Sequence, residues 1–309
     1  MSELGIRVVA GLYLGVSYHN SGDYLRAVDC YTTTLASLEG QPIQERFGLV
    51  AVAAVLTKAY LAYSLAEVGR YVEGCACGEE AVRIAEAVSH PYSQIWANNW
   101  LGYLYLRSGG PAIEVLERAL ALCSDTGTRI GFPFAASYLG AAHTMVGHLD
   151  RAIPLLEQAV DAGVSMKFPM AQALRLCLLG EAYVSARRVA DAFNAAGRAL
   201  TQSRDYKERG NEAWAIRLLG EIHSEEDPIN FKAAQASYDQ AIALAQELGM
   251  RPLVAHCHSG LARLYRRVGD QAGSETHLAT ATKIYRELGS TFWLTRVEAM
   301  IGAESSVRP

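Results

Sequence analysis

Arginines are gathered near the carboxyl end of the chain, where they offer the clearest chemistry in the sequence. The run Arg263-Leu264-Tyr265-Arg266-Arg267 brings three guanidinium groups onto one short stretch. Guanidinium groups bind carboxylates and phosphates through paired hydrogen bonds. The same run also fits a solvated helix face whose charge is offset by Glu275 and Glu287. We therefore keep two interpretations of these arginines, an anion-binding surface and a solvated face.

Histidines and cysteines form no pattern that predicts catalysis or a metal site. His256-Cys257-His258 has the residue types of a metal site, but side chains two apart on a helix diverge, so they cannot share one ion. His143 and His223 are most simply core histidines. The sequence has no phosphate-binding loop and no GxSxG, HExxH or paired CxxC motif. We expect no enzymatic activity, no cofactor and no metal.

A repeated pair of helices must position these side chains. A leucine followed by a small residue recurs along the chain, with successive leucines 38 to 47 residues apart. The small residue lets two helices approach closely, and a glycine some seven residues later ends the first helix in most copies. The second helix carries two small residues seven apart, which lie on one stripe. The leucine–small pairs are Leu14-Gly15, Leu61-Ala62, Leu101-Gly102, Leu139-Gly140, Leu179-Gly180, Leu219-Gly220 and Leu261-Ala262.

This unit resembles the tetratricopeptide repeat. Its clearest copy reads Leu139-Gly140-x-x-His143-x-x-x-Gly147-x-x-x-x-Ala152-x-x-x-Leu156-x-x-Ala159. That repeat has a period of about 34 residues, whereas the usual spacing here is 40, so we expect lengthened helices or linkers. HEAT and armadillo repeats have a period of about 40 residues, but they lack this order of leucine, glycine and alanine positions. The resemblance covers essentially the whole chain.

The resemblance implies an all-α fold, a right-handed α-solenoid of about seven extended (~40-residue) helix hairpins with a C-terminal capping helix. We expect one solenoid domain over residues 1–302, with the cap at 290–302 and a disordered tail at 303–309. The hairpins are expected near 5–40, 48–88, 92–126, 130–163, 169–204, 210–248 and 251–289.

In such an array the first helices of the hairpins line a concave groove. Positions at a fixed distance from each leucine–small pair should face this groove, one residue from each repeat. These positions hold apolar and aromatic residues in the first half of the chain and charged residues in the second. An aromatic ledge beside a charged stretch suits a peptide or helix with an apolar anchor and polar flanks. The predicted partner-binding residues are Tyr63, Trp96, Asn99, Tyr103, Arg107, Phe134, Trp214, Arg217, Glu221, His256, Arg263 and Arg267.

The two tryptophans of this set, Trp96 and Trp214, have a second interpretation. They can pack between neighbouring repeats, because protein cores use the same residues as interfaces. A pocket between Trp96, Asn99, Tyr103 and Phe134 would instead suit a small molecule. These interpretations lead to different functions, a protein-binding scaffold or a small-molecule sensor or cryptic enzyme.

Composition narrows the class of partner. The chain has 309 residues, half of them hydrophobic, and a formal net charge of −4. That balance gives no reason to expect nucleic acid or an anionic membrane as partner. No signal peptide or transmembrane stretch is recognised, and the six cysteines mostly stand singly in apolar patterns. We expect a soluble cytoplasmic protein, with possible self-association through its N-terminal face, where helix begins almost at once.

The last fifty residues carry a closer resemblance. They include Gly249-Met250-Arg251-Pro252-Leu253, Leu261-Ala262-Arg263-Leu264-Tyr265-Arg266-Arg267-Val268-Gly269-Asp270, Tyr285-Arg286-Glu287-Leu288-Gly289 and Phe292-Trp293-Leu294. This stretch is similar to the C-terminal repeat region of bacterial STAND/AAA-type signalling ATPases, which are often fused to class III nucleotide cyclase domains. The resemblance implies a sensor and interaction arm. Neither the phosphate-binding loop of the ATPase nor the cyclase carboxylates are present, so neither activity is expected here.

Overall fold

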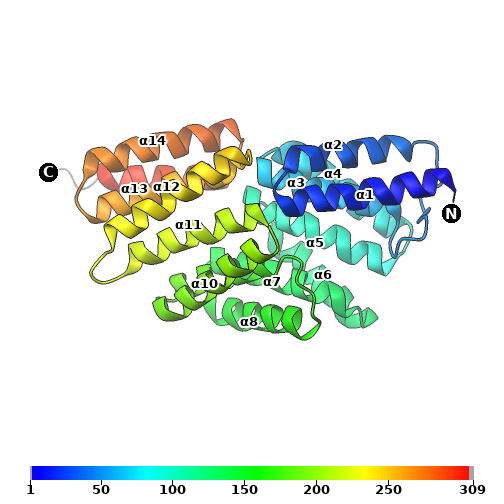
Figure 1. Cartoon of the computed structure of the whole chain (residues 1–309), viewed down its shortest axis with the longest axis horizontal. Coiled ribbons are helices and arrows are strands. Elements are labelled where there is room, and N and C mark those ends of the chain that lie inside the picture. The colour runs from blue at the N-terminus through cyan, green and yellow to red at the C-terminus, as the bar shows by residue number, and fades with distance from the viewer. Residues whose placement is uncertain (1, 306–309) are drawn as a thin grey trace. The chain divides into compact units, whose positions relative to one another are not determined.

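Helices make up the whole architecture, and they pack in consecutive pairs. The computed structural model describes residues 2–305, and the side chains of residues 2–300. Within that range it has fifteen α-helices and one short 3-10 turn. Each odd-numbered helix from α1 to α13 packs mainly against the helix that follows it (Figure 1). The expected all-α, tetratricopeptide-like hairpin fold is confirmed, and in the described residues no helix is long and apolar enough to cross a membrane.

The chain divides into two compact units, Met1–Pro169 and Met170–Pro309. The first unit holds four hairpins, and the 3-10 turn η1 (Arg129–Gly131) precedes the fourth. Their helices are α1 (Glu3–Ser21) with α2 (Tyr24–Ser37), α3 (Ala53–Val68) with α4 (Tyr71–Ala87), α5 (Pro91–Ser108) with α6 (Ala112–Thr126), and α7 (Phe132–Met145) with α8 (Leu149–Ser165).

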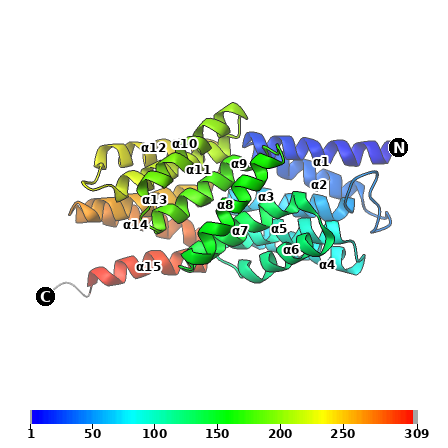
Figure 2. The same ribbon diagram turned by 90° about the horizontal axis from the view of Figure 1, so that it is seen from below.

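The second unit holds three hairpins and a final helix, α15 (Thr291–Ser305). Its hairpins are α9 (Gln172–Ser185) with α10 (Val189–Asp205), α11 (Arg209–Glu225) with α12 (Phe231–Glu247), and α13 (Arg251–Arg267) with α14 (Gln271–Glu287). Helix α15 packs on α14 and buries Val297 against it, at the place of the expected cap (Figure 2). It extends to Ser305, and residues 306–309 of the expected disordered tail lie outside the described residues.

Small residues bring the two helices of a hairpin together, as the leucine–small pairs predicted. A Cβ atom added to Gly102 of α5 would lie 2.4 Å from a methyl group of Leu116 on α6. At Gly140 of α7, the added atom would lie 2.6 Å from Leu156 of α8. These distances are too short for non-bonded carbons, so only glycine allows this approach.

Most turns between paired helices use the left-handed backbone conformation; the turn from α11 to α12 does not. Gly69 and Gly109, for example, follow α3 and α5 with φ angles of 80° and 85°. Glycine adopts this conformation without steric cost, which is why it ends helices so often. After α9 no glycine is present, and Arg187 takes the left-handed conformation instead, with φ 58°.

Candidate partner-binding site

The predicted aromatic residues of the first unit, Tyr63, Trp96, Tyr103 and Phe134, meet in one aromatic stack. Trp100 and Tyr138 complete this stack. They come from α3, α5 and α7, whose inward faces pack side by side. The rings of Tyr63 and Trp100 are stacked with centroids 4.1 Å apart, and Trp96 and Phe134 lie 5.2 Å apart. All six side chains are buried.

Within this stack, Trp96 has the packing role that was one of its two interpretations. Its ring contacts rings from three helices, namely those of Tyr60, Tyr92, Trp100 and Phe134. Only 5% of the residue is exposed. A partner could therefore reach Trp96 only if the stack opened.

Arg107 and Tyr103 belong to a buried polar network at one end of the stack. The Tyr103 hydroxyl donates a short hydrogen bond to Oε1 of Glu67, and Nε of Arg107 donates to the Tyr103 oxygen at 2.8 Å. The Arg107 guanidinium also lies 3.8 Å from Glu67, so the buried charges are paired. Burial raises the pKa of the Tyr103 hydroxyl well above its usual range; Arg107 opposes this rise, and Glu67 adds to it.

Asn99 of α5 is fully buried. Its Nδ2 donates to the carbonyl oxygen of Gly131 at 3.3 Å, and its Oδ1 has no hydrogen-bond partner among the described residues. One amide group is thus used to hold η1 against α5. Asn99 is therefore a structural residue, because it holds the turn that precedes the fourth hairpin.

The predicted residues of the second unit form a charge ladder, which we define as Glu181, Arg217, Glu221 and Arg263. Arg217 of α11 donates a short hydrogen bond to Glu181 of α9 and a 3.0 Å bond to Glu221. Arg263 of α13 donates to the other oxygen of Glu221 at 3.3 Å. Three successive first helices are therefore linked through alternating charges.

Burial and charge oppose each other at Arg217, whose side chain is only 9% exposed. Burial disfavours its charged form, but the carboxylates of Glu181 and Glu221 more than offset this, so the pKa of Arg217 is raised. At Glu221, burial raises the pKa while Arg217 and Arg263 lower it, and the net result is a lowered pKa. Arg217 and Glu221 are therefore both charged near neutral pH.

A second aromatic row runs beside the ladder. The guanidinium of Arg217 lies 5.3 Å from the ring centroid of Trp214, and the Trp214 ring lies 5.7 Å from His256 of α13. His256 in turn shares a 2.7 Å hydrogen bond with the Tyr285 hydroxyl and packs edge-on against Trp293 of α15. The cap helix thus continues the row that Trp214 and His256 were predicted to form.

The outermost arginines of the second unit are the accessible part of the predicted site. The Arg263 side chain is 44% exposed, and its bond to Glu221 uses one of five N–H donors. Arg267 is 37% exposed, lies 2.9 Å from Glu225, and donates to the Ser224 carbonyl. Arg266, between them, is exposed and makes no ion pair in the described part of the chain. This edge of α13 can therefore offer guanidinium donors to an incoming carboxylate or carbonyl.

The histidine–cysteine triplet separates as expected from helix geometry. His256 faces Tyr285, whereas His258 faces His277, with their Nδ1 atoms 2.9 Å apart. Cys257 is buried between them on a different side of α13. In residues 2–300, no three His, Cys, Asp or Glu side chains lie together so that they could hold a metal ion.

Sequence reasoning missed two features. Trp100 is the most connected ring of the aromatic stack, yet it precedes the leucine–small pair Leu101-Gly102 and so fell outside the counted rows. The other is a hollow along α10, a second helix, whereas the search had followed the first helices. Its available signal was the helical spacing of Asn194, Arg198 and Gln202, four residues apart, with Gly197 beside them.

Comparison with known proteins identifies the fold without a sequence family. No family model and no curated protein matches the sequence. Among solved structures, the Rap conjugation gene regulator of plasmid pLS20, in complex with the Phr* peptide, has a TM-score of 0.72 at 16% identity; the match covers 93% of this chain and 76% of that one.

Two further Rap structures have the same architecture. Apo RapI has a TM-score of 0.62 at 10% identity, with 91% of this chain and 98% of that chain covered. A Rap protein complexed with Competence and Sporulation Factor has a TM-score of 0.57 at 12% identity, with 97% and 99% covered. At these identities the likeness shows a shared tetratricopeptide-like fold.

Proposed function

We propose that this chain is a non-enzymatic peptide- or protein-binding module of a bacterial regulatory system, and that its partner docks on the α13 edge of the charge ladder. The observation that carries the proposal is the exposure of Arg263 and Arg267 at the edge of the ladder, whose Arg217 lies against Trp214 of the Trp214–His256–Trp293 row. Guanidinium groups beside aromatic rings are the residue types that dominate binding energy at interfaces. A role as the sensor arm of a larger signalling protein fits the same site.

The ladder can accept an acidic partner with little rearrangement. A carboxylate that bonds to Arg263 would compete with Glu221, but Glu221 would keep its 3.0 Å bond to Arg217. The buried Arg217 would therefore keep its bonds to Glu181 and Glu221, while the exposed Arg263 exchanged Glu221 for the carboxylate of the partner. We infer that the partner carries an acidic residue next to an apolar anchor.

The relatives support this class of function. One Rap structure was solved in complex with the Phr* peptide, and another with Competence and Sporulation Factor. The alternative, a small-molecule sensor or cryptic enzyme, would use the space between Trp96, Asn99, Tyr103 and Phe134. Those side chains are at most 5% exposed, so this alternative requires the aromatic stack to open.

Peptide display tests the proposal. A library of random dodecapeptides would be selected on the full chain and counter-screened on the double variant Arg263→Ala/Arg267→Ala. We expect enriched peptides with acidic residues beside aromatic or aliphatic ones, which lose binding to that variant. The matched control, Arg251→Ala/Arg286→Ala, removes two other exposed arginines of α13 and α14 and should retain binding. Peptides that bind both variants equally would refute the proposed site.

A further inference from the structure

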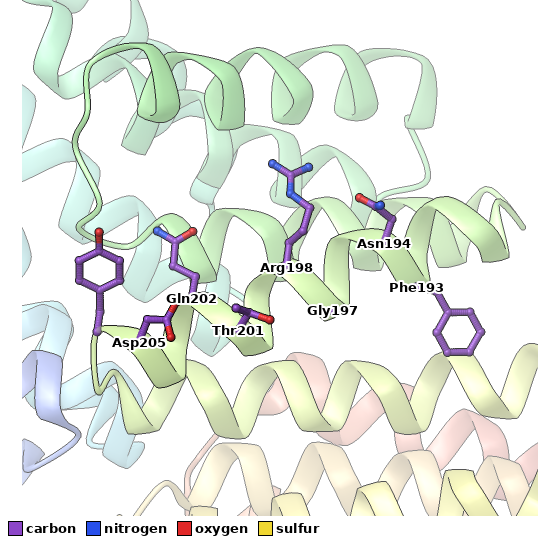
Figure 3. A pocket seen from close by; sticks show the side chains of 8 residues that line it. Phe193, Asn194, Gly197, Arg198, Thr201, Gln202 and Asp205 are labelled. Atoms are coloured by element: carbon purple, nitrogen blue, oxygen red, sulfur yellow. The ribbon is translucent and has the colours of Figure 1, made fainter.

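Helix α10 carries a hollow that belongs to neither the aromatic stack nor the charge ladder. Its volume is about 640 Å³, within the range of about 300–1,000 Å³ typical of ligand sites. The residues that line it are Phe193, Asn194, Gly197, Arg198, Thr201, Gln202, Asp205 and Tyr206 (Figure 3). All eight residues belong to α10 or directly follow it, so the hollow lies along this single helix.

Three polar side chains of this face have no side-chain partner in the described part of the chain. Asn194, Arg198 and Gln202 project to the same side of α10 (Figure 3), and within the described residues none of them makes a side-chain hydrogen bond or ion pair. Phe193 points the other way and packs edge-on against His223 of α11, at 5.1 Å. One side of α10 is thus fixed to the unit, while the other presents unpaired donors and acceptors.

The spacing of these three side chains matches an extended peptide. They are four residues apart, which gives a rise of about 6 Å per step along a helix. An extended chain repeats every two residues, or about 6.7 Å. The amides of Asn194 and Gln202 can each donate to a peptide carbonyl and accept from a peptide N–H. Arg198, between them, is suited to a carboxylate.

Gly197 leaves room for the backbone of such a peptide. It lies in the interior of α10, where glycine is less favourable than alanine, and a Cβ atom added there would meet nothing within 4 Å. No neighbour inside the described chain therefore requires glycine at this position. A peptide backbone lying along α10 would be such a neighbour.

The charges of Asp205 and Arg198 indicate in which direction a peptide would lie along α10. Asp205 lies at the C-terminal end of α10, where the helix dipole also favours a cation. Arg198 is seven residues earlier, a rise of about 10 Å, or about three residues of extended chain. We propose that this hollow binds an extended peptide antiparallel to α10, with the free amino terminus at Asp205 and an acidic side chain of its third or fourth residue at Arg198.

Nuclear magnetic resonance on the ¹⁵N-labelled full chain tests this site directly. The probe is a glycine–serine pentapeptide with a free amino terminus and one aspartate at position four. We expect saturable shifts of the backbone amides of residues 194–206, and N-acetylation of the peptide should weaken binding by about fivefold, as for loss of one exposed charge pair. The variant Gly197→Leu should abolish the shifts, because its side chain fills the hollow.

Matched variants keep the result interpretable. Leucine is a good helix former and the space above Gly197 is open, so Gly197→Leu should fold with a thermal midpoint at least as high as that of the wild type. Gly197→Ala, which adds one methyl group where the peptide backbone approaches, should weaken binding less than Gly197→Leu does, and Arg263→Ala should leave it unchanged, which separates this site from the charge ladder. The proposal is overturned by unshifted α10 amides at millimolar peptide, by equal binding of the acetylated probe, or by unaltered binding to Gly197→Leu. Shifts of the same amides that depend on protein concentration alone would also overturn it, since a second copy would then cover α10.

Discussion

At the scale of single residues, Arg217 is the side chain on which the charge ladder depends. It is almost fully buried and joins Glu181 of α9 to Glu221 of α11. Removing one member of a buried ion pair is far more damaging than removing the whole pair, because the remaining charge loses its partner in a poorly solvated place. Without Arg217 the link between α9 and α11 would be lost, while the Glu221–Arg263 bond would still join α11 to α13.

Arg217→Leu should lower the free energy of unfolding by about 3–5 kcal/mol, the usual loss when a buried ion pair is broken. Urea denaturation followed by circular dichroism measures this. The control Arg286→Leu, at an exposed pair 3.6 Å from Glu298, should change it by less than about 1 kcal/mol. A loss of under about 1 kcal/mol at Arg217 would show that the ladder does not hold the hairpins together.

Two histidines of the last hairpin make stability depend on pH. The Nδ1 atoms of His258 and His277 are 2.9 Å apart, so one must donate and the other accept, which excludes the doubly protonated pair. Burial lowers the pKa of both; His277 lowers that of His258 further, while Asp239 of α12 raises both. Tyr265 stacks on His277 and completes the surroundings.

Because these folded-state pKa values lie below the unfolded value of about 6.5, the unfolded chain binds more protons as the pH falls. The stabilising contribution is complete above about pH 6.5 and is lost as the pH falls below it. His19, whose pKa burial lowers to about 3, acts in the same direction in the other unit. We expect urea denaturation at pH 7.5 and 5.5 to show a smaller loss of stability in His258→Gln/His277→Gln than in the wild type. An identical loss in both would exclude the pair as a source of the pH dependence.

At the scale of elements, each hairpin depends on the small residue that lets its helices approach. Gly102 and Gly197 offer a contrast at this scale, since both are helical glycines. An added Cβ atom would overlap Leu116 at the first and meet open space at the second. The same substitution should therefore have opposite effects at the two positions.

Gly102→Ala should lower the free energy of unfolding by about 1–3 kcal/mol, the range for overpacked cores. Gly197→Ala should raise it by up to about 1 kcal/mol, because alanine favours the helix and meets no obstacle. Thermal or urea unfolding of the two variants side by side gives the comparison. Stabilisation at Gly102 would mean that α5 and α6 are not packed as closely as the structure places them.

The hairpins could be predicted from the sequence because their determinants are local. A leucine–small pair, a turn glycine and two small residues seven apart specify where two helices begin, end and touch. The close approaches at Gly102 and Gly140 confirmed this interpretation. The ring contacts of Trp100 and the ion pair between Arg217 and Glu181 could not be predicted, because they depend on how side chains from different hairpins meet.

At the scale of the whole chain, the predicted site divides between two units. The aromatic stack lies in Met1–Pro169 and the charge ladder in Met170–Pro309. The repeat pattern gave no sign of the division, since the leucines on either side of it, Leu139 and Leu179, keep the usual spacing of 40 residues. The repeat spacing reflects the residues that each hairpin needs for its own packing. It does not predict where the chain divides into compact units.

The most direct test of the central claim is a calorimetric titration of the full chain with a display-selected peptide. Arg263→Ala/Arg267→Ala should weaken binding by at least about tenfold, which corresponds to about 1.4 kcal/mol and is the scale of an interface hot spot. Arg251→Ala/Arg286→Ala should bind within about twofold of the wild type, since exposed pairs outside the site contribute little. Equal affinity of the wild type and both double variants would contradict a partner site on the charge ladder.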